Sequence, residues 1–154
     1  MPATRKDLPV EELLISEVLQ KVSNAKTKKE KVALLQKFNT QALRSLLIWN
    51  FDESVKSAIP SGEVPFRPND APKGTEHTRL LKEHRNLFRF VKGGDNSLKQ
   101  MRREQLFIQM LEGLHAEEAE LICLVKDKSL QDKYRVTKAV VEEAFPQINW
   151  GGRS

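Results

Sequence analysis

Apolar residues recur every three or four positions along most of the chain, and no segment alternates long enough between apolar and polar positions to predict a strand. This pattern predicts an all-α fold in which about eight helices form a single compact domain. The first part of the chain is predicted to form helices over residues 8–24, 27–38, 40–51 and 52–59. Pro9 suits a first helical turn, and Thr27 with Glu30 forms a capping box. Thr40 and Asp52 are expected to cap the next two helices.

The middle of the chain, residues 60–75, holds four prolines and two glycines and predicts an extended connection. It divides a single domain, residues 1–150, into two helical lobes, residues 8–59 and 76–148. The second lobe is predicted to form helices over residues 76–91, 97–113, 117–126 and 136–145. Gly93 and Gly94 follow the first of these, Ser97 caps the second, and Pro146 ends the last. Residues 149–154 are interpreted as a tail outside the functional part of the chain.

Charge is unevenly distributed along the sequence. The 154 residues include 26 Lys and Arg against 21 Asp and Glu, which gives a formal net charge of +5 at pH 7. Residues 73–103 hold nine basic and three acidic residues, whereas residues 104–125 hold five acidic residues and no basic one. The positive excess favours polyanionic partners, and its concentration predicts a basic surface that the acidic segment leaves uncovered.

Three clusters of basic residues are candidate contacts to nucleic-acid phosphates. The first forms one face of the helix predicted over residues 76–91, at a spacing that matches successive phosphates. The second crowds the start of the helix predicted over residues 27–38, where lysines are mildly unfavourable for stability but complete an anion pocket with exposed amides. The third surrounds the polar loop after residue 126. In that order, the clusters are Lys82, Arg85, Arg89 and Lys92; Lys26, Lys28, Lys29 and Lys31; and Lys126, Lys128, Lys133, Arg135 and Lys138.

Each cluster also has a purely structural interpretation. A helix that buries one face needs a polar face of some sign, so the first cluster could be a solvated surface. The lysines of the second could be tolerated surface residues whose charge Glu30 offsets. In the third, Tyr134 could stack or hydrogen-bond at a nucleic-acid backbone, or it could be a buried anchor.

The chain carries no recognisable catalytic or metal-binding pattern. One cysteine and three histidines cannot build a disulfide framework or a structural zinc site, and Gly-rich phosphate loops and Gly-x-Ser-x-Gly elbows are missing from the sequence. His77 and His84 are interpreted as packing residues, His115 as a cap or surface residue, and Cys123 as a core thiol. We therefore expect a non-enzyme without cofactor or metal. No apolar run approaches the roughly 20 residues of a membrane helix, so we also expect a soluble protein with no membrane partner.

The order of elements resembles the N-terminal helical DNA-binding domain of phage-type ATP-dependent DNA ligases. The likeness is carried by EVLQKVSNAKTKKEKVALLQKFNTQALRSLLIWNF (residues 17–51), by Ile59-Pro60, and by the final AFP of residues 144–146. The resemblance implies duplex binding through the lysines that start the second helix and through the loop after Lys126. The chain departs from these ligases in two places: SLQDKYRV (residues 129–136) has no glycine, and the nucleotidyltransferase core with its Lys-x-Asp-Gly motif is missing. The resemblance therefore implies the binding module without the enzyme.

The stretch FIQMLE…AEEAELI…KDK is also similar to small uncharacterised proteins of T-even-like tailed phages, which implies the cytoplasm of an infected bacterial host. Our first hypothesis is a non-enzymatic, sequence-tolerant protein that binds double-stranded DNA. A second is a phage adaptor for replication, transcription or assembly, which docks a phage or host protein through the Pro-rich loop 60–75, with Phe66 and Arg67, or through the acidic segment 104–120. A virion structural protein and an undetected enzyme are further alternatives, and the sequence leaves DNA and RNA undistinguished.

Overall fold

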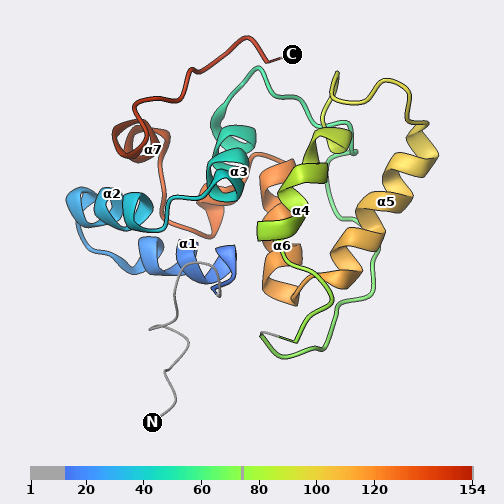
Figure 1. Ribbon diagram of the computed structural model, residues 1–154, viewed down its shortest axis with the longest axis horizontal. Helices are drawn as coiled ribbons and strands as arrows, with labels where there is room; N and C mark the ends of the chain where they lie inside the picture. The colour runs from blue at the N-terminus through green and yellow to red at the C-terminus, as the bar shows by residue number, and fades with distance from the viewer. Residues whose placement is uncertain (1–12, 74, 154) are drawn as a thin grey trace.

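A computed structural model describes residues 13–73 and 75–153, and it is all-helical (Figure 1). The described residues contain no strand beyond an isolated antiparallel bridge between Ser57 and Val91. In these residues no helix has both the length and the apolar character needed to cross a membrane. The α-helices are α1 (Ile15–Asn24), α2 (Lys28–Lys37), α3 (Gln41–Phe51), α4 (Leu80–Glu83), α5 (Gln100–Gly113), α6 (Ala116–Lys126) and α7 (Lys138–Ala144). Two 3-10 segments, η2 (His84–Phe90) and η3 (Leu130–Asp132), complete the set.

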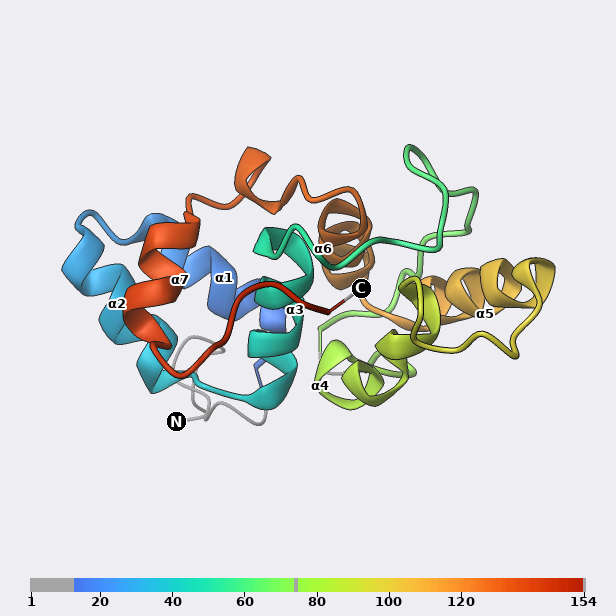
Figure 2. The same cartoon turned by 90° about the horizontal axis from the view of Figure 1, so that it is seen from above.

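Helices α3 and α6 pack against each other at the centre, and their apolar side chains, including Leu46, Leu47, Leu121 and Ile122, are fully buried. Helix α1 contacts both α2 and α6, while α4, η2 and α5 pack on the other side of this centre (Figure 2). The last helix, α7, packs against α2 rather than against the elements that precede it in the sequence. The segments on either side of residues 60–75 therefore interleave in space around one core.

The local cap signals at Thr27 and Thr40 predict two helix starts correctly. Thr27 Oγ1 accepts a hydrogen bond from the Glu30 N–H at 3.1 Å, and Thr40 Oγ1 accepts one from the Leu43 N–H at 3.1 Å. The predicted helices over residues 27–38 and 40–51 are confirmed as α2 and α3, and those over 117–126 and 136–145 as α6 and α7. His115 caps α6 by accepting the Glu117 N–H on Nδ1 at 3.0 Å. Of the first predicted helix, residues 15–24 are helical, and Pro9 lies outside the described residues.

The short helix predicted over residues 52–59 is wrong. Asp52 ends α3 instead of starting a new helix, and its Oδ1 accepts hydrogen bonds from the Ser54 N–H and hydroxyl at 2.9 and 2.7 Å. The chain then runs to the bridge at Ser57, and the Ala58 N–H donates to the carbonyl of Phe90 at 2.8 Å. These long-range bonds replace the intrahelical bonds that a helix would have made.

The single helix predicted over residues 76–91 is also wrong. The helix begins only at Leu80, where the buried carboxylate of Glu118 accepts the Leu80 N–H at 2.9 Å, and it changes to 3-10 geometry at His84. A 3-10 helix has three residues per turn, so the four predicted cations at 82, 85, 89 and 92 do not share one face. Ser97 bonds Asp95 and does not cap the next helix, which starts at Gln100.

The last residues belong to the fold and are not a detached tail. Asp52 Oδ2 accepts hydrogen bonds from the Gly151 N–H at 2.9 Å and from the Arg153 guanidinium at 2.5 Å, and the Arg153 N–H donates to Ser54 Oγ at 3.0 Å. Residues 149–153 are thereby fixed across the C-terminal end of α3. Asp52, which the sequence suggested as a helix start, is their anchor.

Candidate nucleic-acid interface

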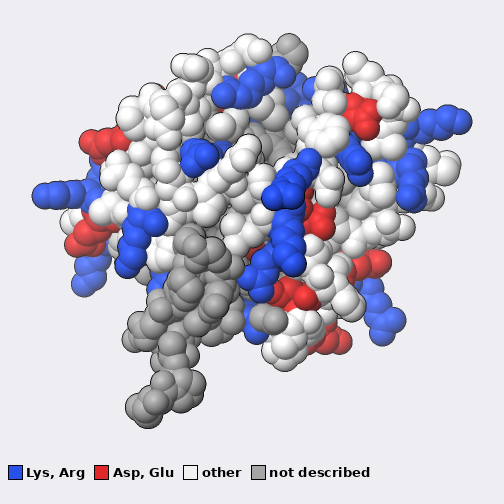
Figure 3. Space-filling model, in the orientation of Figure 1, with Lys and Arg blue, Asp and Glu red and all other residues white. Residues whose placement is uncertain are grey.

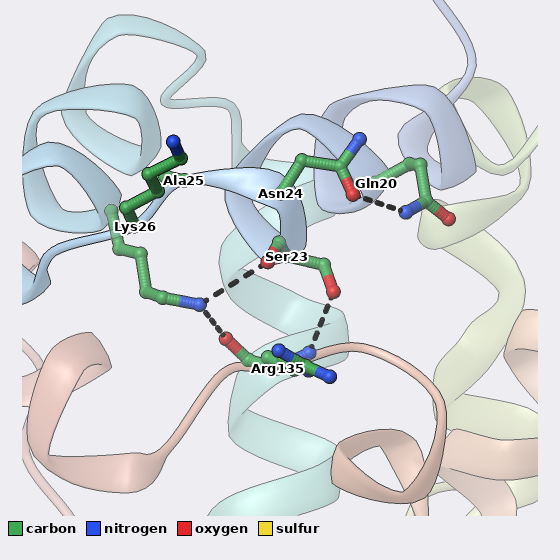
Figure 4. A pocket seen from close by; sticks show the side chains of 7 residues that line it. Gln20, Ser23, Asn24, Ala25, Lys26 and Arg135 are labelled. Carbon is green, nitrogen blue, oxygen red and sulfur yellow. Dashed lines mark hydrogen bonds between the residues drawn. The ribbon is translucent and has the colours of Figure 1, made fainter.

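A polar hollow of about 840 Å³ lies where the turn between α1 and α2 meets residues 133–137 (Figure 4). Helix α1 ends at Asn24, and the next three residues turn the chain into α2. No carboxylate lines the hollow. Its lining consists of Gln20, Ser23, Asn24, Ala25, Lys26, Lys31 and Arg135.

Lys31 holds the two sides of this hollow together. Its Nζ donates to the carbonyl of Arg135 at 2.6 Å and to the carbonyl of Ser23 at 3.5 Å. The Arg135 N–H donates in turn to Ser23 Oγ at 2.9 Å (Figure 4). The Lys31 ammonium is therefore a structural tie, and the backbone that carries Arg135 is fixed beside the start of α2.

Four exposed basic residues form what we call the basic corner: Lys26 and Arg135, which line the hollow, and Lys28 and Lys29, which follow in the first turn of α2. Within the described part of the chain, the side chains of Lys26, Lys29 and Arg135 have no ion pair, while Lys28 lies 3.9 Å from Glu143 with both side chains more than half exposed. The nearby acid Glu30 accepts the Lys26 N–H at 3.1 Å. These cations surround the N-terminal end of α2, where the helix dipole and free amides favour an anion.

Most of the third predicted cluster has structural contacts. Lys126 is buried, and its Nζ donates to the carbonyls of Pro60 and Gly62 and to Asp127 Oδ1, at 2.9, 3.0 and 2.6 Å. Lys128 Nζ donates to the carbonyls of Trp49 and Asp52 at the end of α3, at 2.6 and 2.8 Å. These two ammonium groups fasten the Pro-rich connection and the C-terminus of α3 to α6.

The other members of that cluster lie closer to solvent. Lys133 pairs with Glu120 at 2.5 Å, and the Lys138 ammonium lies 5.0 Å from the centre of the Trp150 ring. Tyr134 is 2% exposed, and burial raises the pKa of its hydroxyl above the usual range. Of the two interpretations of Tyr134, the buried anchor is the one that the structure shows.

The surface over α4 and η2 is also basic, although the first predicted cluster does not lie on one face. Lys82, Arg85 and Lys92 are exposed, and the Arg89 guanidinium lies 5.5 Å from the centre of the Phe88 ring. Figure 3 shows a column of Lys and Arg side chains over α4 on this face.

Helix α3 lies between this surface and the basic corner (Figures 1 and 2). The fold brings the second and third predicted clusters together only where Arg135 lines the same hollow as Lys26 and Lys31. Lys92 of the first cluster lines a different hollow, with Lys126 and Lys128.

Several carboxylates of the acidic segment 104–120 are used within the chain. Glu112 Oε2 accepts the Arg67 N–H at 2.8 Å, and the Glu112 carbonyl accepts from Asn69 at 3.1 Å, which holds the Pro-rich connection against α5. Glu117 pairs with Lys73 at 3.2 Å. The segment thus braces the fold as well as contributing negative charge.

Glu118 is the residue whose role the sequence analysis missed. It is completely buried, and its two carboxylate oxygens accept the first N–H groups of two helices, Ile15 at 2.8 Å and Leu80 at 2.9 Å. Burial raises its pKa to about 7, and these two hydrogen bonds oppose the rise. The sequence does indicate that Glu118 is buried, because position 118 continues the apolar stripe of Leu114, Leu121 and Val125.

The described residues contain no group of three or more His, Cys, Asp and Glu arranged to hold a metal ion. Burial raises the pKa of the Cys123 thiol to about 11, so this side chain is a protonated thiol at neutral pH. The basic corner and the surface over α4 and η2 are therefore the best candidate binding sites, and the positive charge of both favours an anionic ligand.

The family model that matches this chain is described as a family of unknown function (DUF6433) and covers residues 18–132. The chain belongs to this family. The comparisons with curated proteins and with solved structures give no match. Within the DUF6433 region lie α2, the lysines of the basic corner and the whole of α4 and η2, whereas Arg135, α7 and residues 145–153 lie beyond it.

Proposed function

We propose that this DUF6433 protein is a non-enzymatic, sequence-tolerant DNA-binding protein that contacts the phosphate backbone of a duplex through its basic corner. Lys26, Lys28 and Lys29 contact phosphates beside the start of α2, and Arg135 contacts the strand from the adjoining segment. The resemblance to ligase DNA-binding domains supports a duplex as the ligand. The similarity to proteins of tailed phages supports the cytoplasm of an infected bacterium as its location.

The observation that carries this proposal is the convergence of Lys26 and Arg135, neither of which has an ion pair among the described residues, on a hollow without a carboxylate. Lys26 and Arg135 are distant in sequence, yet they line the same hollow because Lys31 and Ser23 tie the two segments together. A protein under selection for stability alone would favour acids in the first turn of α2, where this chain has Lys28 and Lys29. Phosphate contacts of this kind position a protein on DNA without reading sequence.

Fluorescence anisotropy with a labelled blunt duplex at low salt tests the proposal. The triple variant Lys26→Ala, Lys29→Ala and Arg135→Ala is expected to lower the affinity about ten-fold or more, because three phosphate contacts are lost. The matched control removes the same charge from three exposed positions away from the corner: Lys56→Ala, Arg67→Ala and Lys99→Ala. Equal losses of affinity in the two variants, or no duplex binding at micromolar concentrations of the unaltered protein, would refute the proposal.

A further inference from the structure

A second concave site lies between α3 and η2, outside the basic corner. This α3–η2 groove has a volume of about 270 Å³. Its lining is mostly apolar and aromatic and includes no carboxylate. The lining residues that matter here are Ile48, Trp49, His84, Leu87, Phe88 and Val91.

Trp49 lines this groove and carries a hydrogen-bond donor that the fold leaves unused. The residue is only 3% exposed, and within the described part of the chain its indole Nε1 is buried and has no hydrogen-bond partner. Buried donors in native proteins are nearly always paired, so this unpaired indole marks the floor of the groove as a place where the packing of the described residues leaves a polar group unsatisfied.

Phe88 brings an exposed aromatic ring to the same groove. Phe88 is 46% exposed, and Met101 is the other exposed large hydrophobic side chain among the described residues. The backbone that carries Phe88 is fixed, because Gly94 packs so closely that an added Cβ would lie 1.8 Å from the Phe88 carbonyl oxygen. The ring is thus presented to solvent on a rigid support, as a stacking surface requires.

The charges around the groove select an anionic ligand. Arg85 is exposed next to His84, and the Arg89 guanidinium lies over the Phe88 ring. Two acids lie close to these cations: Asp52 pairs with Arg153, itself a groove residue, and Asp95, whose Oδ1 accepts from the Ser97 hydroxyl at 2.6 Å, interacts with Arg89 and Arg103. Burial, with the neighbouring Arg85 charge, lowers the pKa of His84, so its ring is neutral at neutral pH and has one donor and one acceptor nitrogen.

We infer that the α3–η2 groove binds an unpaired base of single-stranded DNA. The base stacks on Phe88 beside the Trp49 side chain, and Arg85 and Arg89 contact the flanking phosphates. Aromatic stacking combined with arginines along the strand is the general way in which proteins hold single strands without reading sequence. That the ligand is DNA rests on the proposed function, while the groove itself is separate from the basic corner.

Trp49 provides the test, since the chain has one other tryptophan, Trp150. In a Trp150→Phe background, titration with the single strand dT8 is expected to quench the Trp49 fluorescence to saturation. Adding Phe88→Ala is expected to lower the dT8 affinity about ten-fold, as the loss of one stacked base does. The matched control Met101→Ala removes the other exposed hydrophobic side chain and should leave the affinity unchanged.

The same variants separate this inference from the proposed function. Phe88→Ala is expected to change the affinity for a blunt duplex by less than about two-fold relative to the unaltered protein, because a duplex offers no unpaired base. If the blunt duplex binds but dT8 neither quenches Trp49 nor depends on Phe88, the groove inference is overturned and the proposed function stands. If dT8 binding depends on Phe88 but the basic-corner variant binds the duplex as tightly as the unaltered protein does, the groove inference stands and the proposed function is overturned. Quenching by an uncharged Leu-rich peptide but not by dT8 would assign the groove to a protein segment and overturn the inference.

Discussion

Asp52 and Glu118 are two buried carboxylates whose surroundings shift their pKa values in opposite directions. Burial raises the pKa of both, but Asp52 receives hydrogen bonds from Ser54, Gly151 and Arg153 that outweigh burial and lower its pKa well below the usual range. Glu118 receives only the two N–H groups at the starts of α1 and α4, so burial prevails and its pKa rises to about 7. The number of donors, more than the depth of burial, decides the charge state of each carboxylate.

Replacing Asp52 by Asn should lower the free energy of unfolding at neutral pH by about 1–3 kcal/mol, because buried donors lose a charged acceptor. Since the pKa of Asp52 is depressed in the folded state, its contribution is present above the unfolded pKa of about 4 and is lost as the pH falls further. Urea unfolding of both proteins at pH 7 and pH 3 measures this. The difference in the free energy of unfolding between the two proteins should be smaller at pH 3 than at pH 7. An equal difference at both pH values would contradict this account of Asp52.

Glu118 should have the opposite effect on the pH dependence of stability. With a pKa of about 7 folded and about 4 unfolded, Glu118 holds a proton in the folded state between these values, so the free energy of unfolding should fall as the pH rises from 5 to 8. Glu118 should account for about 3 kcal/mol of that fall, from about 1.4 kcal/mol per pKa unit. The slope should be absent in Glu118→Gln, as urea midpoints across this range will show. An unaltered slope in that variant would place the titrating group elsewhere.

At the scale of the helices, the sequence predicts what short-range contacts decide. Thr27 and Thr40 lie three residues before the N–H groups that they accept, so their role is legible from spacing alone. The helix predicted over residues 76–91 fails because its start is set by Glu118, which is 38 positions away from Leu80. Contacts at that separation leave no periodic trace in the sequence.

In the candidate site, too, the sequence predicts what depends on neighbouring residues and misses what depends on long-range contacts. The lysines at the start of α2 were predicted because they are neighbours in sequence, and the structure shows Lys26, Lys28 and Lys29 exposed there, while Lys31 binds backbone carbonyls. Lys126 and Lys128 were grouped with them by charge, yet both bind backbone carbonyls inside the fold. Charge alone does not distinguish a lysine that faces solvent from one that caps a carbonyl.

The tie made by Lys31 gives a prediction at the same scale. Lys31→Met keeps the apolar stem but removes the bonds to the carbonyls of Arg135 and Ser23, so residues 133–137 should loosen from α2. Amide hydrogen exchange at Arg135 should accelerate, and duplex affinity should fall more than in Lys37→Met, which removes the same charge at the far end of α2. Equal effects of the two variants on exchange and affinity would show that Lys31 acts through charge alone.

At the scale of the whole molecule, one core carries two basic surfaces that face different directions. Helix α7 closes on α2 and brings Arg135 to the basic corner, while residues 149–153 close on the end of α3. The basic corner and the surface over α4 and η2 thus lie on either side of α3. We propose that a duplex binds at the first of these surfaces and an unpaired strand at the second.

The salt dependence of duplex binding tests the central claim most directly. If the basic corner contacts phosphates, the logarithm of the binding constant should fall linearly with the logarithm of the salt concentration, with a slope of about −0.9 per phosphate contact. In the variant Lys26→Ala, Lys29→Ala and Arg135→Ala the slope should become shallower by about 2 to 3, as three lost contacts require. A slope equal to that of the unaltered protein would contradict phosphate binding at this corner.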